Sequence, residues 1–319
     1  MFDFLAVFFL IIGLVLLFKG GDLLVEGSIS IAKKLNISDF AIGLTLVAVG
    51  TSFPELFVSI VSNNHNLADL LVGNILGSNI ANILLILGLS AFLTKIYLPH
   101  NLIWREIPFS ALAVMVFFIM ANDFIFLNGS NNFISVSDGL ILLIFYLIFL
   151  YYIFSEDKSK NILPHFSPPK HPLPIALFIS FIGSVFLYLG AEFTTNGASN
   201  IARALGISEK FIGLSIVAIG TSLPELITSL VSLFKRNHNI LVGNIVGSNI
   251  ANIFFVLGLS ASLKSIPYNP SANIDVFMAF VASFVLFLAM IFNKKSFLSR
   301  FEGTLFLIIY ILYLLSYFI

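Results

Sequence analysis

The chain has 319 residues, of which 59% are hydrophobic and only 10% charged, and its mean hydropathy is +1.05. A soluble domain carries about 25% charged residues, so this composition excludes a soluble enzyme and a disordered protein and predicts an integral membrane protein. The 16 basic and 16 acidic residues balance to a net charge of zero, which excludes a strongly basic nucleic-acid-binding protein. Cysteine is absent, so disulfides and thiolate metal sites are excluded as well.

Ten apolar segments along the chain predict an all-α membrane protein with ten transmembrane helices. The first segment is predicted to be a membrane helix and not a removed signal peptide, because it has no basic start and no small-residue cleavage site follows it. A polar linker at 156–172 separates a first set of five helices (1–155) from a second set (173–319). The segments lie at about 4–34, 39–62, 68–93, 103–121, 137–154, 173–204, 209–234, 240–263, 273–292 and 302–318.

Basic residues are divided unevenly between the two sides of the membrane that these helices define. Because cytoplasmic loops carry an excess of Lys and Arg, the loops after the odd-numbered helices are predicted to be cytoplasmic, with both termini outside the cell membrane. One basic residue, Lys19, lies inside the first helix. The loops after odd-numbered helices hold the 12 residues Lys33, Lys34, Lys95, Arg105, Lys158, Lys160, Lys170, Lys235, Arg236, Lys294, Lys295 and Arg300, and the opposite side holds the 3 residues Arg203, Lys210 and Lys264.

An internal repeat relates the two sets of helices. Residues 43–91 recur at 213–261 with a constant offset of 170 residues and no gap, and 30 of the 49 positions are identical. Because five is an odd number, the second set must enter the membrane from the opposite side, which agrees with the charge distribution. Inverted repeats are typical of transporters, whose site lies near the bilayer midplane where the halves meet and whose access alternates between the two sides.

The second and seventh helices each contain the sequence Gly-Thr-Ser-x-Pro-Glu, at 50–55 and 220–225. Proline removes an amide donor and glycine loosens the same turn, so each helix is predicted to break there and to free backbone carbonyls, with those of Ala48 and Ala218 as candidates. Carbonyl, hydroxyl and carboxylate oxygens suit Ca²⁺ or Na⁺ and not a soft metal. The motif supplies Thr51, Ser52, Glu55, Thr221, Ser222 and Glu225 as candidate ligands.

A purely local role is the alternative for the two glutamates. Each stands three residues after a serine, which is the spacing of a capping box at the start of a helix. A carboxylate near the membrane centre costs about 2.5 kcal/mol or more, however, and glutamine would serve as a cap. The pattern therefore favours cation ligands over helix caps.

The third and eighth helices carry Gly-Asn-x-x-Gly-Ser-Asn-x-x-Asn, at 73–82 and 243–252. Asn74, Ser78 and Asn82 recur every four residues and share one helical face, which is predicted to point at the site. The adjacent Gly73, Gly77 and Ala81 are predicted to permit close helix packing. Packing and interhelical hydrogen bonds are also the interpretation favoured for Asn79 and Asn249.

Other polar residues carry weaker signals. Asp22, Glu26 and Glu192 lie in the first and sixth helices, where they are predicted to line an entrance or to form interhelical contacts, and Lys19 is within reach of Asp22. The sequence contains no HExxH, GxSxG or phosphate-loop pattern, so neither enzymatic chemistry nor ATP use is indicated.

The two paired motifs resemble those of the cation/Ca²⁺ antiporter superfamily, and most closely its prokaryotic Na⁺/Ca²⁺ exchanger branch. The resemblance covers nearly the whole chain and implies exchange of Ca²⁺ for Na⁺ by alternating access, without a cofactor or an obligate protein partner. It implies four cation sites in a diamond, with the first and sixth helices sliding as a gating pair. The implied ligands are Ala48, Thr51, Ser52, Glu55, Ser78 and Asn82 from the first half, and Ala218, Thr221, Ser222, Glu225, Ser248 and Asn252 from the second.

One position departs from that pattern. Structurally characterised members of the branch have Asp where this chain has Asn252, so the site here has two formal negative charges instead of three. Two charges balance one Ca²⁺ but balance three Na⁺ less well. Coupling to H⁺ or K⁺, or transport of another divalent cation, therefore remains open, as do a passive cation channel and a Ca²⁺-binding scaffold that transports nothing.

Overall fold

The structure is a computed structural model that describes residues 4–98, 102–126, 132–159, 169–205, 218–292 and 297–316. The chain forms two compact units, and each unit draws on both sequence repeats. The first unit comprises Met1–Pro54 and Glu156–Asn244, and the second comprises Glu55–Ser155 and Ile245–Ile319.

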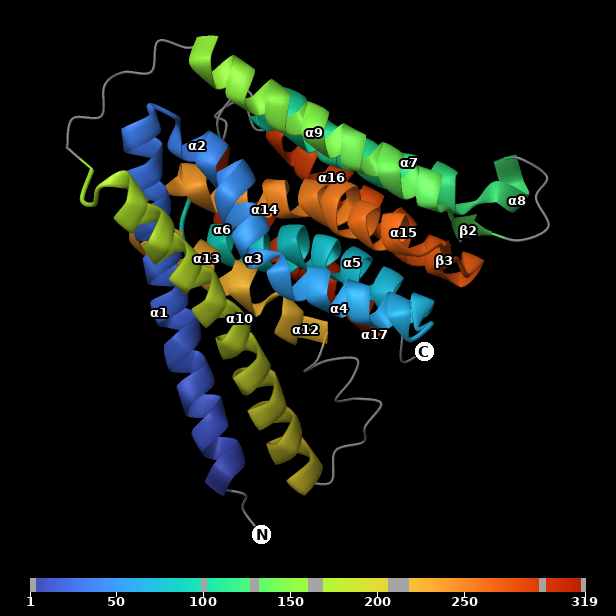
Figure 1. The fold of residues 1–319 in the computed structure, drawn as a ribbon, viewed down its shortest axis with the longest axis horizontal. Helices are drawn as coiled ribbons and strands as arrows, with labels where there is room; N and C mark the ends of the chain where they lie inside the picture. Colours follow the sequence, from blue (N-terminus) through green and yellow to red (C-terminus); the bar gives the residue numbers. More distant parts are fainter. Residues whose placement is uncertain are drawn as a thin grey trace. The chain divides into compact units, whose positions relative to one another are not determined.

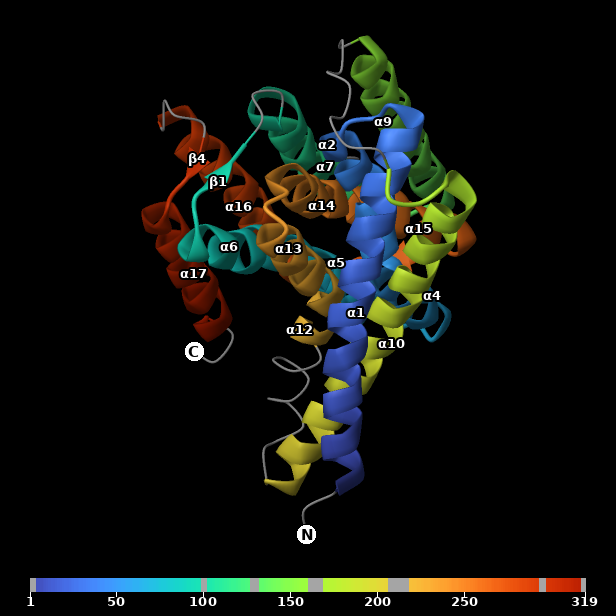
Figure 2. The ribbon, with the colours of Figure 1, turned by 90° about the vertical axis from the view of Figure 1, so that its left-hand side faces the viewer.

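Two long helices, α1 (Phe4–Leu35) and α10 (Leu173–Ala204), dominate the first unit. They run antiparallel and side by side (Figure 1, Figure 2), with Gly13 opposite Gly190 and Gly20 opposite Gly183. The unit also contains α2 (Asp39–Ile42), the π-helical turn η1 (Gly43–Val47), α3 (Ala48–Thr51), α12 (Ala218–Thr221), α13 (Leu223–Phe234) and the start of α14 (His238–Ala251).

A glycine seam holds α1 against α10. A Cβ atom added at Gly20 would lie 2.7 Å from the backbone nitrogen of Leu187, and one added at Gly183 would lie 2.6 Å from that of Leu24. The two backbones therefore touch directly, which only glycine permits. The seam glycines recur every seven residues and are related by the 170-residue offset, so the repeat extends into both long helices. They are Gly13, Gly20 and Gly27 on α1, and Gly183, Gly190 and Gly197 on α10.

The second unit is also built of helices, and two small strand pairs join its loops. Strand β1 (Ile96–Tyr97) pairs antiparallel with β4 (Phe297–Leu298), and β2 (Phe133–Ile134) pairs with β3 (Ile266–Pro267). Its helices are α4 (Phe53–Asn64), α5 (Ala68–Ala81), η2 (Asn82–Leu87), α6 (Gly88–Leu93), η3 (Leu102–Glu106), α7 (Ile107–Ala121), α8 (Asp123–Phe126), α9 (Val136–Ser159), the remainder of α14, η5 (Asn252–Leu257), α15 (Gly258–Leu263), η6 (Pro270–Ala272), α16 (Asn273–Phe292) and α17 (Arg300–Leu315).

The helices confirm that the chain is an all-α, multi-pass membrane protein. Within the described residues, seven helices are long and apolar enough to cross a bilayer, or eight when the bent pair Asp39–Thr51 and Phe53–Asn64 counts as one. The seventh predicted helix is described only from Ala218 onward, where α13 forms its apolar part, because 206–217 lie outside the described residues. The tenth corresponds to α17, which has 16 residues.

Candidate functional site

Both predicted helix breaks are present, and they have the same backbone geometry. Ser52 has φ −82° and ψ 8° between α3 and α4, and Ser222 has φ −86° and ψ 3° before α13. A regular helix has ψ near about −42°, so each serine interrupts the helical path. Proline is the second residue of the helix that follows each break, and the first pair of helices is bent by 45°.

The carbonyl of Ala48 is not freed by its break, contrary to the prediction. It accepts a hydrogen bond from the amide of Ser52 at 3.0 Å, because that amide still completes the helical pattern. The Thr51 hydroxyl lies 3.1 Å from the same carbonyl and 3.1 Å from Asn244 Oδ1. At the second break the Ser222 amide donates to Ile219, so the two breaks differ in this detail.

In the first unit, two of the predicted ligands, Ser52 and Glu225, are in contact. This glutamate lies in the first turn of α13 and is 1% exposed. The hydroxyl of Ser52 donates to its Oε1 at 3.3 Å, which joins the first break to the helix that follows the second. The Ser52 and Thr51 side chains are buried as well. Ser52 thus contacts Glu225, and the adjacent Thr51 contacts Asn244. The Nδ2 atom of Asn244 donates in turn to the Ser229 hydroxyl at 3.3 Å.

The helix-cap alternative is not supported for Glu225. Ser222 precedes α13 but makes no side-chain hydrogen bond as its cap. The chain does contain a true capping box with the same spacing, at Ser299 and Glu302, where the serine amide donates to the glutamate at 2.8 Å. Identical spacing therefore leads to different roles, because Glu302 turns back to its own helix end and Glu225 meets a serine of another helix.

In the second unit, Glu55 is fully buried on α4 and also contacts a serine of another helix. The hydroxyl of Ser78 on α5 donates to Glu55 Oε1 at 3.1 Å. Asn82, Ser248 and Asn252 are buried in the same unit. Each glutamate thus accepts a hydrogen bond from a serine of a different helix.

Asn79 on α5 and Asn249 on α14 link these two helices in the second unit. Asn82 Nδ2 donates to Asn249 Oδ1 at 2.9 Å, and Asn252 Nδ2 donates to Asn79 Oδ1 at 3.0 Å. Asn79 Nδ2 donates to the backbone oxygen of Asn249, and Asn249 Nδ2 to that of Asn79, both at 3.1 Å. The predicted interhelical hydrogen bonds are confirmed, and the crossed arrangement includes both candidate ligands. The close packing predicted for Gly73 and Gly77 is wrong, because in the part of the chain that the structure describes a Cβ atom added at either would meet nothing within 4 Å. Their repeat partner Gly243 does pack closely, since a Cβ added there would lie 2.8 Å from the Phe40 carbonyl oxygen.

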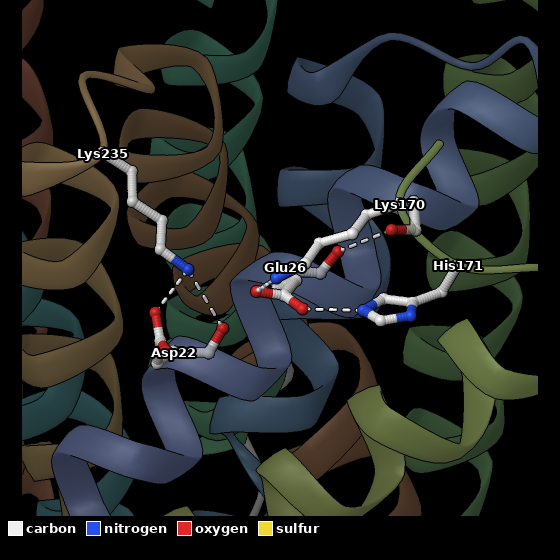
Figure 3. A network of polar contacts seen from close by, with 6 residues as sticks. Asp22, Glu26, Lys170, His171 and Lys235 are labelled. Atoms are coloured by element: carbon white, nitrogen blue, oxygen red, sulfur yellow. Dashed lines mark hydrogen bonds and ion pairs between the residues drawn. The ribbon is translucent and has the colours of Figure 1, made fainter. Parts of the chain in front are cut away.

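The acidic residues of α1 form ion pairs, shown in Figure 3. Asp22 pairs with Lys235 at the end of α13, at 2.5 Å, and not with Lys19. Glu26 binds Lys170 at 2.8 Å and His171 at 2.7 Å, both just before α10. The interhelical contact predicted for Asp22 is confirmed. No sequence spacing signals the His171 contact, because it depends on the antiparallel packing of α10 on α1.

Comparison with known proteins agrees with this arrangement. The model of the family described as "Sodium/calcium exchanger protein" matches residues 5–155 and 175–318. An uncharacterized membrane protein of Methanocaldococcus jannaschii is 35% identical over 312 residues, covering 98% of each chain. The inner membrane protein YrbG of Escherichia coli (strain K12) is 32% identical over 277 residues, covering 84% of this chain and 83% of YrbG.

A solved structure of the sodium-calcium exchanger NCX_Mj superposes with a TM-score of 0.82 at 35% identity, covering 98% of both chains. That structure was soaked with Na⁺ without Ca²⁺, and another, soaked with Na⁺ and Ca²⁺, also has a TM-score of 0.82. A family match over both halves and identity along almost the entire chain lead to one assignment. The chain belongs to the sodium/calcium exchanger family.

Proposed function

We propose that the chain is a secondary active antiporter that exchanges Ca²⁺ for Na⁺ across the cell membrane by alternating access. The observation that carries this proposal is the duplicated environment of Glu55 and Glu225, each buried, each following a helix break, and each bound by a serine from another helix. A buried carboxylate is costly unless it is paired or binds a cation. Transported cations supply the charge that these sites require.

The Glu55 and Glu225 groups together would coordinate the cations near the membrane midplane. Ca²⁺ takes six to eight oxygen ligands, and an ionised carboxylate is an acceptor that can bind a cation through either of its oxygens. Coordination by Ala48 would require the cation to displace the hydrogen bond that the Thr51 hydroxyl donates to this carbonyl, with the hydroxyl rotating and keeping its proton. The full proposed set is Ala48, Thr51, Ser52, Glu55, Ser78, Asn82, Ala218, Thr221, Ser222, Glu225, Ser248 and Asn252.

The proposed topology has ten membrane helices in two inverted repeats of five. The distribution of basic residues supports cytoplasmic loops after the odd-numbered helices and both termini outside. The helices α1 and α10 would move as one body during alternating access, and their glycine seam supports this because contact between backbones leaves little freedom for one helix to slip along the other.

Because the amide of Asn252 is neutral, a second form of the same function is coupling to H⁺ or K⁺ in place of Na⁺. With two carboxylates, the site neutralises one Ca²⁺ completely. An exchanger that carries fewer positive charges on its return step would therefore also fit the two-carboxylate site.

Flux in proteoliposomes tests the proposal and separates these forms. Purified protein is reconstituted in vesicles loaded with Na⁺, K⁺ or acidic buffer, and ⁴⁵Ca²⁺ uptake is followed after dilution into ion-free medium. We expect uptake to require an outward Na⁺ gradient and to be lost in Glu55→Gln and in Glu225→Gln. The matched control is Glu302→Gln, which changes a glutamate of the same Ser-x-x-Glu spacing at the α17 cap and should leave exchange intact.

Equal uptake with and without any gradient would refute exchange, and Ca²⁺ current without counter-ion movement would indicate a channel. Dependence on H⁺ or K⁺ alone would reassign the counter-ion.

A further inference from the structure

The side-chain oxygens of Asn82 and Asn252 have an unusual environment. Both residues are fully buried, and among the described residues neither Oδ1 atom has a hydrogen-bond partner. The Nδ2 atom of each, by contrast, donates a hydrogen bond of good length. Leaving a buried amide oxygen without a partner is costly, so each of these oxygens is a candidate ligand for a cation.

Backbone carbonyls determine which way these amides face. The carbonyl oxygen of Asn249 only accepts hydrogen bonds, so the Asn79 side chain must turn its Nδ2 toward it and its Oδ1 away. Asn79 Oδ1 is in turn only an acceptor, so Asn252 must present its Nδ2 to it. The Oδ1 of Asn252 is therefore forced to the side away from Asn79.

The same argument holds in the mirrored direction, from the carbonyl of Asn79 through Asn249 to Asn82. Reversal of either ligand amide would place two oxygen acceptors about 3 Å apart and leave a buried N–H₂ group aimed at the cation. These hydrogen bonds thus leave the Oδ1 atom of each ligand amide, and not its N–H₂ group, available for coordination.

We infer that Asn79 and Asn249 are positioning residues that orient the Oδ1 atoms of Asn252 and Asn82 for cation binding. The inference rests on the proposed function, because it assumes that Asn82 and Asn252 are ligands. It also predicts a crossed pattern of dependence, because each positioning residue acts on a ligand of the other helix. Asn79 acts through Asn252, and Asn249 acts through Asn82.

The chain offers a matched control for loss of a buried asparagine pair. Asn122 and Asn273 exchange side-chain hydrogen bonds at 3.1 and 3.0 Å between α7 and α16. Asn122 makes a further bond to the Phe118 carbonyl at 2.8 Å. This pair contains no proposed ligand, so its loss should change stability without changing ion affinity.

The test compares Asn79→Leu and Asn249→Leu with Asn122→Leu in purified full-length protein. The Ca²⁺ dissociation constant is measured by equilibrium ⁴⁵Ca²⁺ binding, the Ca²⁺ KM and kcat by uptake into Na⁺-loaded proteoliposomes, and the ion-free Tm by thermal unfolding. Loss of a residue that orients a metal ligand typically weakens metal affinity by about 10- to 100-fold. We expect a weakening of about that size in the two test variants, with Ca²⁺ KM rising more than kcat falls, and no change in affinity for Asn122→Leu.

Double mutants test the crossed pattern. Asn79→Leu should add little to the affinity loss caused by Asn252→Ala, because both remove the same oriented oxygen, whereas its effect should add to that of Asn82→Ala. If Asn79→Leu does not fold, Asn79→Ser takes its place, because its shorter side chain cannot reach both partners.

Unchanged Ca²⁺ affinity in a folded Asn79 variant, or additive effects of the changes at 79 and 252, would overturn the inference while leaving the antiporter proposal standing. Wild-type protein that binds no ⁴⁵Ca²⁺ would overturn both.

Discussion

Replacing Gly20 by alanine should push α1 away from α10, although the change adds only one methyl group. The added Cβ would lie 2.7 Å from the Leu187 nitrogen and 2.8 Å from the Gly183 oxygen, both backbone atoms of α10 that move only if the whole helix moves. Overpacking of this kind costs about 1–3 kcal/mol. The gain in helix propensity offsets about 1 kcal/mol, so we expect a net destabilisation of about 0–2 kcal/mol.

The neighbouring Gly21 provides the control. A Cβ there would lie 3.3 Å from Ile227 Cγ2 and 3.4 Å from Val231 Cγ2, which are side-chain atoms at ordinary or slightly tight distance. Gly21→Ala gains the same helix propensity without the backbone clash, so it should be neutral or stabilising by up to about 1 kcal/mol. Reversible unfolding in mixed micelles measures the two variants side by side. Because both variants gain the same helix propensity, Gly20→Ala should be less stable than Gly21→Ala by the overpacking cost of about 1–3 kcal/mol, and equal stability would refute the backbone contact between α1 and α10.

Three further changes test other parts of the structure. Glu225→Gln should abolish Na⁺-dependent ⁴⁵Ca²⁺ uptake in vesicles without loss of folded protein in size-exclusion chromatography, and normal uptake would remove Glu225 from the site. Lys235→Met should lower the free energy of unfolding by less than about 1 kcal/mol, because the side chains of Lys235 and Asp22 are 31% and 49% exposed; a larger loss in denaturant titrations would contradict this. Burial raises the pKa of the Tyr268 hydroxyl from 10.0 to about 12, so the stability that its neutral form contributes is complete below pH 10 and is lost as pH rises toward about 12. Alkaline unfolding curves should show this loss in the wild type and not in Tyr268→Phe, and identical curves would argue against it.

The repeated motifs predicted the two helix breaks well because the chemistry that interrupts a helix is local. Proline inside a helix removes a backbone donor and clashes with the preceding turn, and both breaks occur within the predicted motif, at Ser52 and Ser222. The face formed by Ser78 and Asn82 follows from helical periodicity alone, and the contact of Ser78 with Glu55 agrees with it. The carbonyl of Ala48 was mispredicted because its helical donor is the amide of Ser52, which is retained. The donor that Pro54 lacks would have met the carbonyl of Gly50, four residues before it.

Sequence spacing did not identify which residues are partners in the contacts between helices. The partner of Asp22 is Lys235, 213 residues away, and not Lys19 one turn back, because α13 ends beside α1. The sequence shows a weak match at the 170-residue offset, with Gly20-Gly21-Asp22 opposite Gly190-Ala191-Glu192, but it does not show that the seam glycines contact the backbone of the opposite helix.

The sequence by itself determined the class of the protein, its repeated halves and the residue types available to a cation. These follow from hydropathy, from the offset of 170 residues, and from the few carboxylates that an apolar chain retains. The tertiary structure alone decided how those groups face one another. Asn79 and Asn249 show the reason, since an asparagine side chain is both a donor and an acceptor, and only the fixed backbone carbonyl opposite it selects which end faces its neighbour.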